Sequence, residues 1–242
     1  MTEIAEILRL GHAGDGIVAD GLFVPYTVPG DVVRIAPEGA RGRLIEIVTP
    51  GASRAAPPCA HFGRCGGCAL QMMEREAYLA WKRDGIIAAL KQRGFADAPV
   101  DDIRAVPPGT RRRAMFKARG MGKTVALGFY EPESRTLVDI GQCPVLAPEL
   151  AALIGPLKAQ LASILRPGET AELHATAADN GIDLSLKLKR ARAPDLLMAL
   201  SELAASLKLA RLSWNGETVA MAAAPTLRIG RFTIGLPPES FL

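Results

Sequence analysis

Three of the four cysteines in this chain lie within ten positions of one another. They occur in the stretch PPCAHFGRCGGCALQ as Cys59, Cys65 and Cys68, and the remote fourth, Cys143, precedes Pro144. Four thiolates can bind zinc or an iron–sulfur cluster. Structural zinc sites usually combine two separate Cys-x2-Cys pairs, whereas this sequence has one such pair. The spacing therefore favours an iron–sulfur cluster, and leaves zinc or unmetallated thiols as alternatives.

The cellular compartment bears on the role of these thiols. The first residues, MTEIAEILRLGHAGDG, contain no basic region followed by an apolar one, so we expect no secretory signal. No apolar run approaches the roughly 20 residues that span a bilayer. We therefore predict a cytoplasmic protein that does not bind membranes. Because the cytosol is reducing, clustered cysteines there are more often metal ligands or redox groups than disulfides.

The positive charge of the chain is concentrated in one segment. Residues 59–130 carry 13 basic and 6 acidic side chains, whereas residues 1–58 carry 5 and 7, and residues 131–242 carry 11 and 12. A concentrated basic field favours polyanions such as nucleic acid, although a solvated basic face would look the same in composition. The candidate nucleic-acid-binding residues are Arg64, between the cysteines, and the basic side chains of Thr110–Lys123: Arg111, Arg112, Arg113, Lys117, Arg119 and Lys123.

The elements that must position these residues form a mixed, β-rich pattern. Short apolar or alternating runs separated by turn signals predict strands at Ile4–Leu10, Gly16–Ala19, Leu22–Pro25, Val32–Ile35 and Leu44–Val48, which suit a small closed barrel. A Pro- and Ala-rich linker, Thr49–Pro58, follows. Helical spacing predicts a helix over Met72–Arg93, ended by Gly94.

The rest of the chain alternates hairpins with two helices. We expect strands at Met115–Lys117, Thr124–Tyr130, Leu137–Ile140, Ala171–Ala177, Ile182–Lys189, Arg211–Trp214, Thr218–Ala222 and Thr226–Ile229, and helices at Pro148–Leu165 and Pro194–Leu209. This pattern predicts an α+β domain with a mostly antiparallel sheet.

The cysteine segment also resembles a known family. Cys59–Gln71 is similar to the Cys-x5-Cys-Gly-Gly-Cys-x2-Gln signature of the iron–sulfur-containing RNA (uracil-5)-methyltransferases, and Cys143 in DIGQCP resembles their downstream ligand. Phe23-Val24-Pro25 and Val28-Pro29-Gly30-Asp31 resemble their TRAM barrel, an OB-like RNA-binding module. Gly128-Phe129-Tyr130 resembles a strand end of their central domain, and LPPESFL (Leu236–Leu242) resembles the entry to their catalytic domain.

This resemblance implies a domain organisation and a set of ligands. Residues 1–50 would form the TRAM-like barrel, 51–95 the linker, iron–sulfur loop and following helix, 96–236 the central α+β domain, and 237–242 the connection to a catalytic domain. Cys59, Cys65, Cys68 and Cys143 would bind a [4Fe-4S] cluster. The substrate would be RNA, ribosomal more readily than transfer RNA, and the protein a monomer.

The resemblance also implies a reaction that the sequence does not place in this chain. The family transfers a methyl group from S-adenosylmethionine to C5 of uracil, using residues of a Rossmann-like domain. We find no strand, glycine-rich turn and helix in the order that such a cofactor site needs. We therefore predict that the Rossmann-like domain is absent and that the chain alone is inactive. The alternatives are a stand-alone iron–sulfur electron carrier and a zinc-stabilised RNA-binding module.

Overall fold

The structure is a computed structural model of the 242-residue chain that describes residues 2–239. It consists of two compact units, Met1–Val106 and Pro107–Leu242. Across the described residues, none of the helices combines the length and the apolar character needed to cross a membrane.

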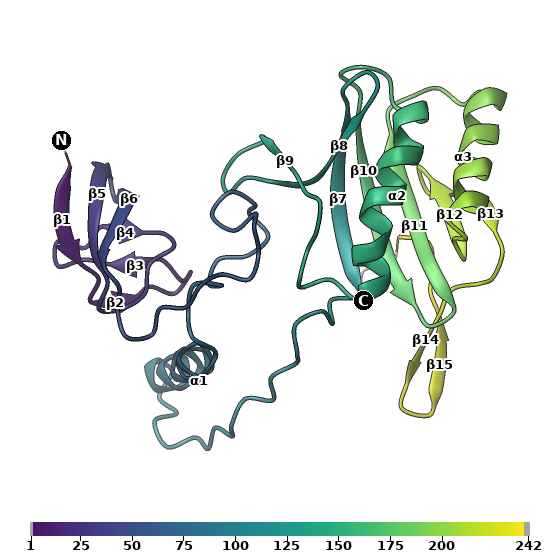
Figure 1. The fold of residues 1–242 in the computed structure, drawn as a ribbon. Coiled ribbons are helices and arrows are strands. Elements are labelled where there is room, and N and C mark those ends of the chain that lie inside the picture. Colours follow the sequence, from purple (N-terminus) through teal and green to yellow (C-terminus); the bar gives the residue numbers. More distant parts are fainter. Residues whose placement is uncertain (1, 240–242) are drawn as a thin grey trace. The chain divides into compact units, whose positions relative to one another are not determined.

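The first unit contains a six-stranded sheet (Figure 1). Its strands are β1 (Glu3–Glu6), β2 (Arg9–Leu10), β3 (Gly16–Ile17), β4 (Phe23–Val24), β5 (Val32–Glu38) and β6 (Arg41–Thr49), in the spatial order β1-β5-β6-β4-β3-β2. The predicted strand Ile4–Leu10 is divided in two. Ile7 still exchanges backbone hydrogen bonds with Gly30 and Asp31, whereas the amide of Leu8 already donates to Ile17. The chain thus turns from one edge of the sheet to the other at this point, and Ile7 enters the core.

A buried carboxylate fixes the segment that follows β6. Asp31 has a fully buried side chain, and its two oxygens accept hydrogen bonds from the amides of Val28 (2.7 Å) and Gly51 (2.8 Å). The guanidinium of Arg54 binds the same carboxylate, with Nη2 2.6 Å from Oδ2. Burial by itself raises the pKa of Asp31, but these hydrogen bonds outweigh it and hold the pKa below its ordinary value. The predicted linker is therefore attached to the sheet.

Helix α1 (Arg75–Gln92) follows the cysteine loop, as the sequence predicts. It ends in a Schellman motif, in which Gly94 donates to Lys91 and Phe95 donates to Leu90. Gly94 has a φ of 85°, which glycine adopts without strain. Of the residues that the structure describes, none in α1 is buried.

The second unit is built on a seven-stranded sheet. Its order is β13-β12-β11-β10-β7-β8-β9, with all neighbours antiparallel except β11 and β12. The strands are β7 (Arg113–Gly120), β8 (Val125–Tyr130), β9 (Leu137–Asp139), β10 (Thr170–Ala178), β11 (Gly181–Leu188), β12 (Arg211–Trp214) and β13 (Glu217–Met221). Helices α2 (Pro148–Ile164) and α3 (Pro194–Ser206) cover one face (Figure 1). The molecule is thus mixed and sheet-rich.

Alternation along the strands separates the two faces of this sheet. Phe116, Leu173, Leu186 and Trp214 form one register row across β7, β10, β11 and β12, and all four are buried. The helices contribute the other half of this core, including Leu150, Leu157 and Leu161 of α2 and Leu200 of α3. The intervening residues, which are mostly polar, lie on the opposite face.

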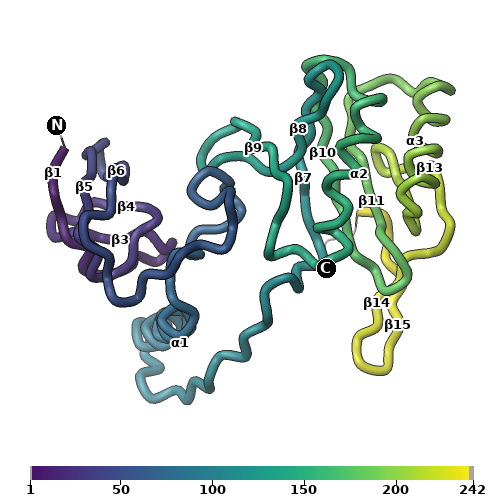
Figure 2. The backbone as a smooth tube through the Cα atoms, viewed as in Figure 1, coloured from purple at the N-terminus to yellow at the C-terminus, as the bar shows by residue number. Residues whose placement is uncertain are grey.

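A separate hairpin follows β13. Strands β14 (Thr226–Ile229) and β15 (Phe232–Gly235) pair only with each other among the described strands, and the ribbon extends beyond the end of the large sheet (Figures 1 and 2). The sequence predicts β14 but misses β15.

Candidate nucleic-acid interface

The face of the large sheet opposite the helices carries three polar register rows, and Ser185, Asp183 and Arg211 within them are buried. Lys117 on β7, Glu172 on β10 and Lys187 on β11 lie directly opposite one another. The next row along the strands contains His174 and Ser185, and the third contains Thr176, Asp183 and Arg211. We call this surface the polar face. It arises because the strands that bury leucine and phenylalanine toward the helices must direct their alternate side chains away from them.

The centre of the polar face is a network of ion pairs. Glu172 binds the ammonium group of Lys117, and its Oε1 lies 2.6 Å from Nε2 of His174. The hydrogen bond with His174, and then the one from Lys117, lower the pKa of Glu172 to about 2. Glu172 is therefore a carboxylate at any physiological pH. Glu172 neutralises Lys117, which sequence analysis predicts to bind RNA.

The end of the described chain approaches the same face. Glu239 accepts a hydrogen bond from Ser185 at 2.9 Å and pairs with Lys187 at 3.1 Å. Burial raises the pKa of Glu239, but these two partners outweigh it and leave the pKa below its ordinary value. Lys187 is thus also paired.

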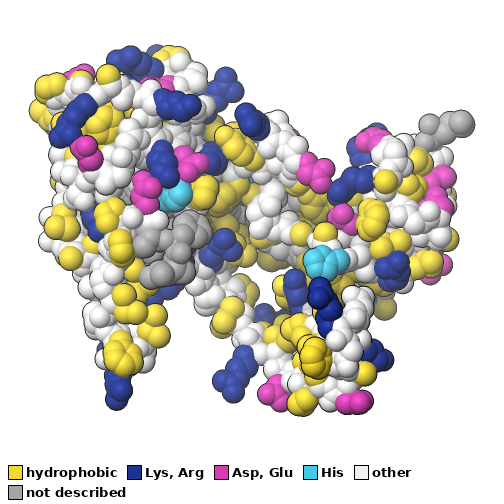
Figure 3. Space-filling view, turned by 180° about the vertical axis from the view of Figure 1, so that it is seen from behind, with side chains coloured by type: hydrophobic (Ala, Val, Ile, Leu, Met, Phe, Trp, Pro, Cys, Tyr) yellow, Lys and Arg dark blue, Asp and Glu magenta, His cyan; other side chains and the backbone are white. Residues whose placement is uncertain are grey.

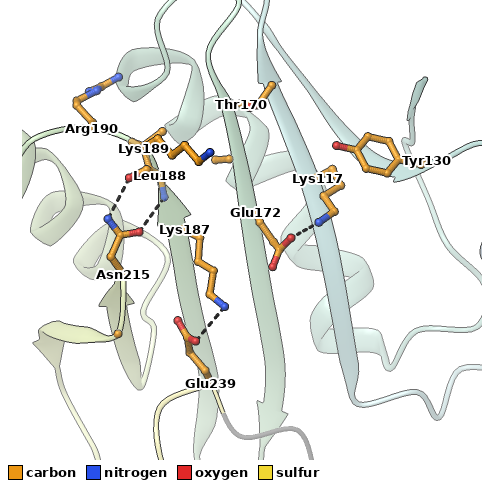
Figure 4. Close-up of a pocket in the computed structure, with 12 residues that line it drawn as sticks. Lys117, Tyr130, Thr170, Glu172, Lys187, Leu188, Lys189, Arg190, Asn215 and Glu239 are labelled. Carbon is orange, nitrogen blue, oxygen red and sulfur yellow. Dashed lines mark hydrogen bonds and ion pairs between the residues drawn. The ribbon is translucent and has the colours of Figure 1, made fainter. Parts of the chain in front are cut away.

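A pocket of about 630 Å³ opens beside this network (Figure 4). Its charged lining consists of Lys117, Glu172, Lys187, Lys189, Arg190 and Glu239. Arg190 is bound to Glu169, with Nε 3.0 Å from Oε1, and this contact lowers the pKa of Glu169. Within residues 2–239, Lys189 has no ion pair. The pocket lining therefore combines one cation that has no ion pair, Lys189, with three cations that are paired with carboxylates.

The structure separates the residues predicted to bind RNA into two groups. Arg112 donates to the carbonyl of Ala177 and to Asp179, and Lys117 is paired with Glu172, so both have structural partners. Arg119 and Lys123, at the β7–β8 end of the sheet, are exposed and form no ion pair in the described part of the chain. Arg64 is exposed in the cysteine loop of the first unit. Arg111 donates to the carbonyl of Arg113.

Sequence analysis misses the basic residues on β11 and just beyond it. Lys187, Lys189 and Arg190 lie outside the basic run, in a part of the chain whose net charge is close to zero. They reach Lys117 only because β10 pairs with both β7 and β11. The KLKR stretch at 187–190 is a signal that could have indicated them, since it holds three cations in four positions.

The cysteine loop forms compact turns in the first unit. The amide of Phe62 donates to Cys59, and the amide of Cys65 donates to His61 at 2.9 Å. Phe62 packs edge-on against Tyr26, in the turn that follows β4, with ring centroids 5.2 Å apart. Burial, followed by the nearby Asp15 and Cys65, raises the pKa of Tyr26. The loop is therefore attached to the sheet through an aromatic contact.

The four cysteines are divided between the two units. Each is half-buried and none forms a disulfide; Cys59, Cys65 and Cys68 lie in the loop, and Cys143 lies in the second unit between β9 and α2. Among residues 2–239, no three His, Cys, Asp or Glu side chains are grouped as metal ligands would be.

The chain is similar to RNA methyltransferases along nearly its whole length. It is 38% identical over 240 residues to an uncharacterised RNA methyltransferase of Brucella suis, covering 98% of this chain and 57% of that protein. It is 34% identical over 200 residues to the 23S rRNA (uracil(1939)-C(5))-methyltransferase RlmD of Halomonas elongata, covering 78% of this chain and 41% of that protein. No family model matches the chain.

The fold is similar to that of a solved methyltransferase. The tRNA (uracil-54, C5)-methyltransferase of Pyrococcus abyssi, solved with S-adenosyl-L-homocysteine, matches with a TM-score of 0.71 and 20% identity, over 99% of this chain and 60% of that one. These alignments cover nearly all of this chain but only about 60% of the length of each relative.

These comparisons correct two predictions. Sequence analysis predicts a fold without a Rossmann-like methyltransferase domain and a chain that is inactive alone. Both predictions are wrong, because proteins named as methyltransferases align with 98–99% of this chain, and the fold of one matches it over 99% of its length. Both depend on the point at which the sequence stops, and that point carries no information about activity.

Proposed function

We propose that this chain acts in S-adenosylmethionine-dependent methylation of uracil C5 in RNA. The observation that carries this proposal is the 38% identity to an RNA methyltransferase over 98% of the chain. The fold match to a methyltransferase solved with S-adenosyl-L-homocysteine supports the choice of methyl donor. In this reaction the methyl group leaves the sulfonium sulfur of the donor, and the C5 proton of uracil is lost to a base.

The substrate that we propose is ribosomal RNA. A named ribosomal RNA enzyme is 34% identical to this chain, whereas the solved transfer RNA enzyme is 20% identical. The exposed Arg119, Lys123 and Lys189 support a polyanionic substrate, since none of them is neutralised by a carboxylate within the described residues. We also propose that residues 1–50 are a TRAM-like RNA-binding module, on the resemblance of Phe23–Pro25 and Val28–Asp31 to that module.

The experiment supplies the chain with methyl-labelled S-adenosylmethionine and unmodified 23S ribosomal RNA. Nuclease digestion and mass spectrometry of the nucleosides should show labelled 5-methyluridine. Transfer RNA lacking 5-methyluridine is the competing substrate. Label in transfer RNA alone would contradict the ribosomal assignment. Absence of label, together with absence of binding to either RNA, would overturn the proposal.

A [4Fe-4S] cluster bound by Cys59, Cys65, Cys68 and Cys143 is a further part of the proposal. Its support is the spacing of these cysteines and the resemblance of Cys59–Gln71 to an iron–sulfur signature; the side-chain positions do not add to it. The test is anaerobic reconstitution of the chain with iron and sulfide, followed by analysis of iron, acid-labile sulfide and zinc. Stoichiometric zinc without iron would contradict the cluster. The Cys68→Ser variant should retain less iron than an Ala69→Ser control.

A further inference from the structure

The β14–β15 hairpin has one apolar and one polar side. Its register pairs Leu227 with Ile234 and Ile229 with Phe232, so these four side chains share one face. Thr226, Arg228, Thr233 and Gly235 share the other face. The apolar face is largely uncovered, since Ile229 is 59% exposed, Phe232 60% and Ile234 38%. An exposed apolar strip of this kind is typical of an interaction surface.

The hairpin is held at its base and free at its tip. Asn180 accepts a hydrogen bond from the amide of Thr226 (3.0 Å), and Asp179 accepts one from the amide of Arg228 (2.6 Å). Beyond these contacts, every residue from 228 to 235 is exposed. A two-stranded ribbon is marginal in water without such support. The fold therefore anchors a ribbon whose outer half is exposed.

The tip carries positive charge beside an aromatic ring. Arg231 occupies the turn after Gly230, and its guanidinium lies 5.1 Å from the centroid of the Phe232 ring. The segment TLRIGRFTIG (226–235) contains two arginines and no acidic residue. In the space-filling view, hydrophobic side chains gather along this projection and a basic side chain lies at its end (Figure 3).

We propose that the β14–β15 hairpin binds unpaired nucleotides of the RNA substrate. Phe232 stacks on a base, and Arg231 beside it contacts a flanking phosphate. A purely apolar ribbon would fit a protein surface or a second copy of the chain, but two arginines in a segment that has no acidic residue of its own favour a polyanion. Single-stranded RNA satisfies both requirements, because its bases present apolar faces and its backbone is anionic. This inference rests on the proposed RNA substrate.

The test measures the affinity of the full chain for a fluorescein-labelled oligouridine, with an RNA duplex of equal length as competitor. Loss of one base stack predicts that Phe232→Ala binds oligouridine about tenfold more weakly. Phe232→Trp should restore binding, and Arg231→Ala should reduce the salt dependence. Met198→Ala, which truncates a side chain of α3 that is 63% exposed, is the matched control and should bind as the wild type does. Thermal unfolding of each variant establishes that it is folded.

The outcomes separate the hairpin from the proposed function. Oligouridine binding by Phe232→Ala equal to that of the wild type would overturn the hairpin inference alone. A wild-type chain that binds neither oligouridine nor ribosomal RNA would overturn the proposed function itself. A dimer in light scattering that Phe232→Ala dissociates, with RNA binding unchanged, would assign the apolar face to a second copy and also overturn the inference.

Discussion

The guanidinium of Arg112 lies 2.6 Å from the carboxylate of Asp179, a residue 67 positions further along the chain. Asp179 in turn accepts a hydrogen bond from the amide of Arg228. Arg112, which sequence analysis predicts to bind RNA, therefore supports the base of the β14–β15 hairpin. The hydrogen bond from Arg112 also lowers the pKa of Asp179, so the pair is charged at neutral pH.

Removal of this support should loosen the hairpin without unfolding the sheet. We expect Arg112→Ala to accelerate tryptic cleavage after Arg228 and Arg231, because Asp179 loses the cation that orients it toward the Arg228 amide. The measurement is limited proteolysis followed by mass spectrometry. Arg192→Ala, which removes an exposed ion pair with Glu217, is the control. Equal cleavage rates in the two variants would contradict the structural role of Arg112.

Basic side chains that form no ion pair in the described structure should account for more of the RNA affinity than paired ones. We expect Arg119→Ala, Lys123→Ala and Lys189→Ala each to reduce the slope of log K against log salt by about 0.7 for single-stranded RNA, one phosphate contact apiece. Arg192→Ala, whose side chain is paired with Glu217 in the second unit, should leave the slope unchanged. The measurement is a binding titration over a range of salt concentrations. If none of the three substitutions alters the slope, these side chains do not contact the RNA phosphates.

Acid should weaken the polar face through Glu172. Its pKa is about 2 in the folded chain against an ordinary value of 4.5, so folding favours the deprotonated form. The resulting stabilisation is complete above about pH 4.5 and is lost as the pH falls toward 2. Glu172→Gln should therefore lower the urea midpoint at neutral pH and lose less stability than the wild type near about pH 3. Glu202→Gln, at an exposed position of α3, is the control. Parallel acid profiles for wild type and Glu172→Gln would contradict this account.

The buried carboxylate of Asp31 should be essential to the first unit. Asp31→Ala leaves Arg54 without its partner and two backbone amides without acceptors, and breaking a buried ion pair costs about 3 kcal/mol or more. We expect the urea midpoint for unfolding of the first unit, measured by circular dichroism, to fall accordingly. Asp20→Ala, which removes an exposed carboxylate that accepts one hydrogen bond from Leu22, should have a small effect. If both variants unfold alike, Asp31 is not the attachment point described above.

The local elements of this fold are largely predictable from the sequence. The Asp179-Asn180-Gly181 turn predicts the β10–β11 hairpin, and the prolines at the starts of α2 and α3 mark where those helices begin. β15 is missed because its only preceding turn signal is Gly230, followed by an arginine. Each of these features depends on residues close together in the chain.

The register between distant strands is what the sequence does not predict. Lys117 meets Glu172 across 55 positions, and β12 joins β11 in parallel only after the chain has passed through α3. Nothing in the basic run around Lys117 indicates a glutamate partner. The division of the arginines and lysines into paired and uncommitted side chains therefore requires the three-dimensional structure.

Helix α1 contrasts with α2, although the two have nearly the same length. Within residues 2–239, α1 buries none of its side chains, whereas α2 buries six. A helix without a buried face is marginally stable in water, and the backbone amides of α1 are therefore expected to exchange with deuterium well before those of α2. The segment after the cysteine loop is thus an independent unit of local opening, able to melt and re-form while both sheets remain intact.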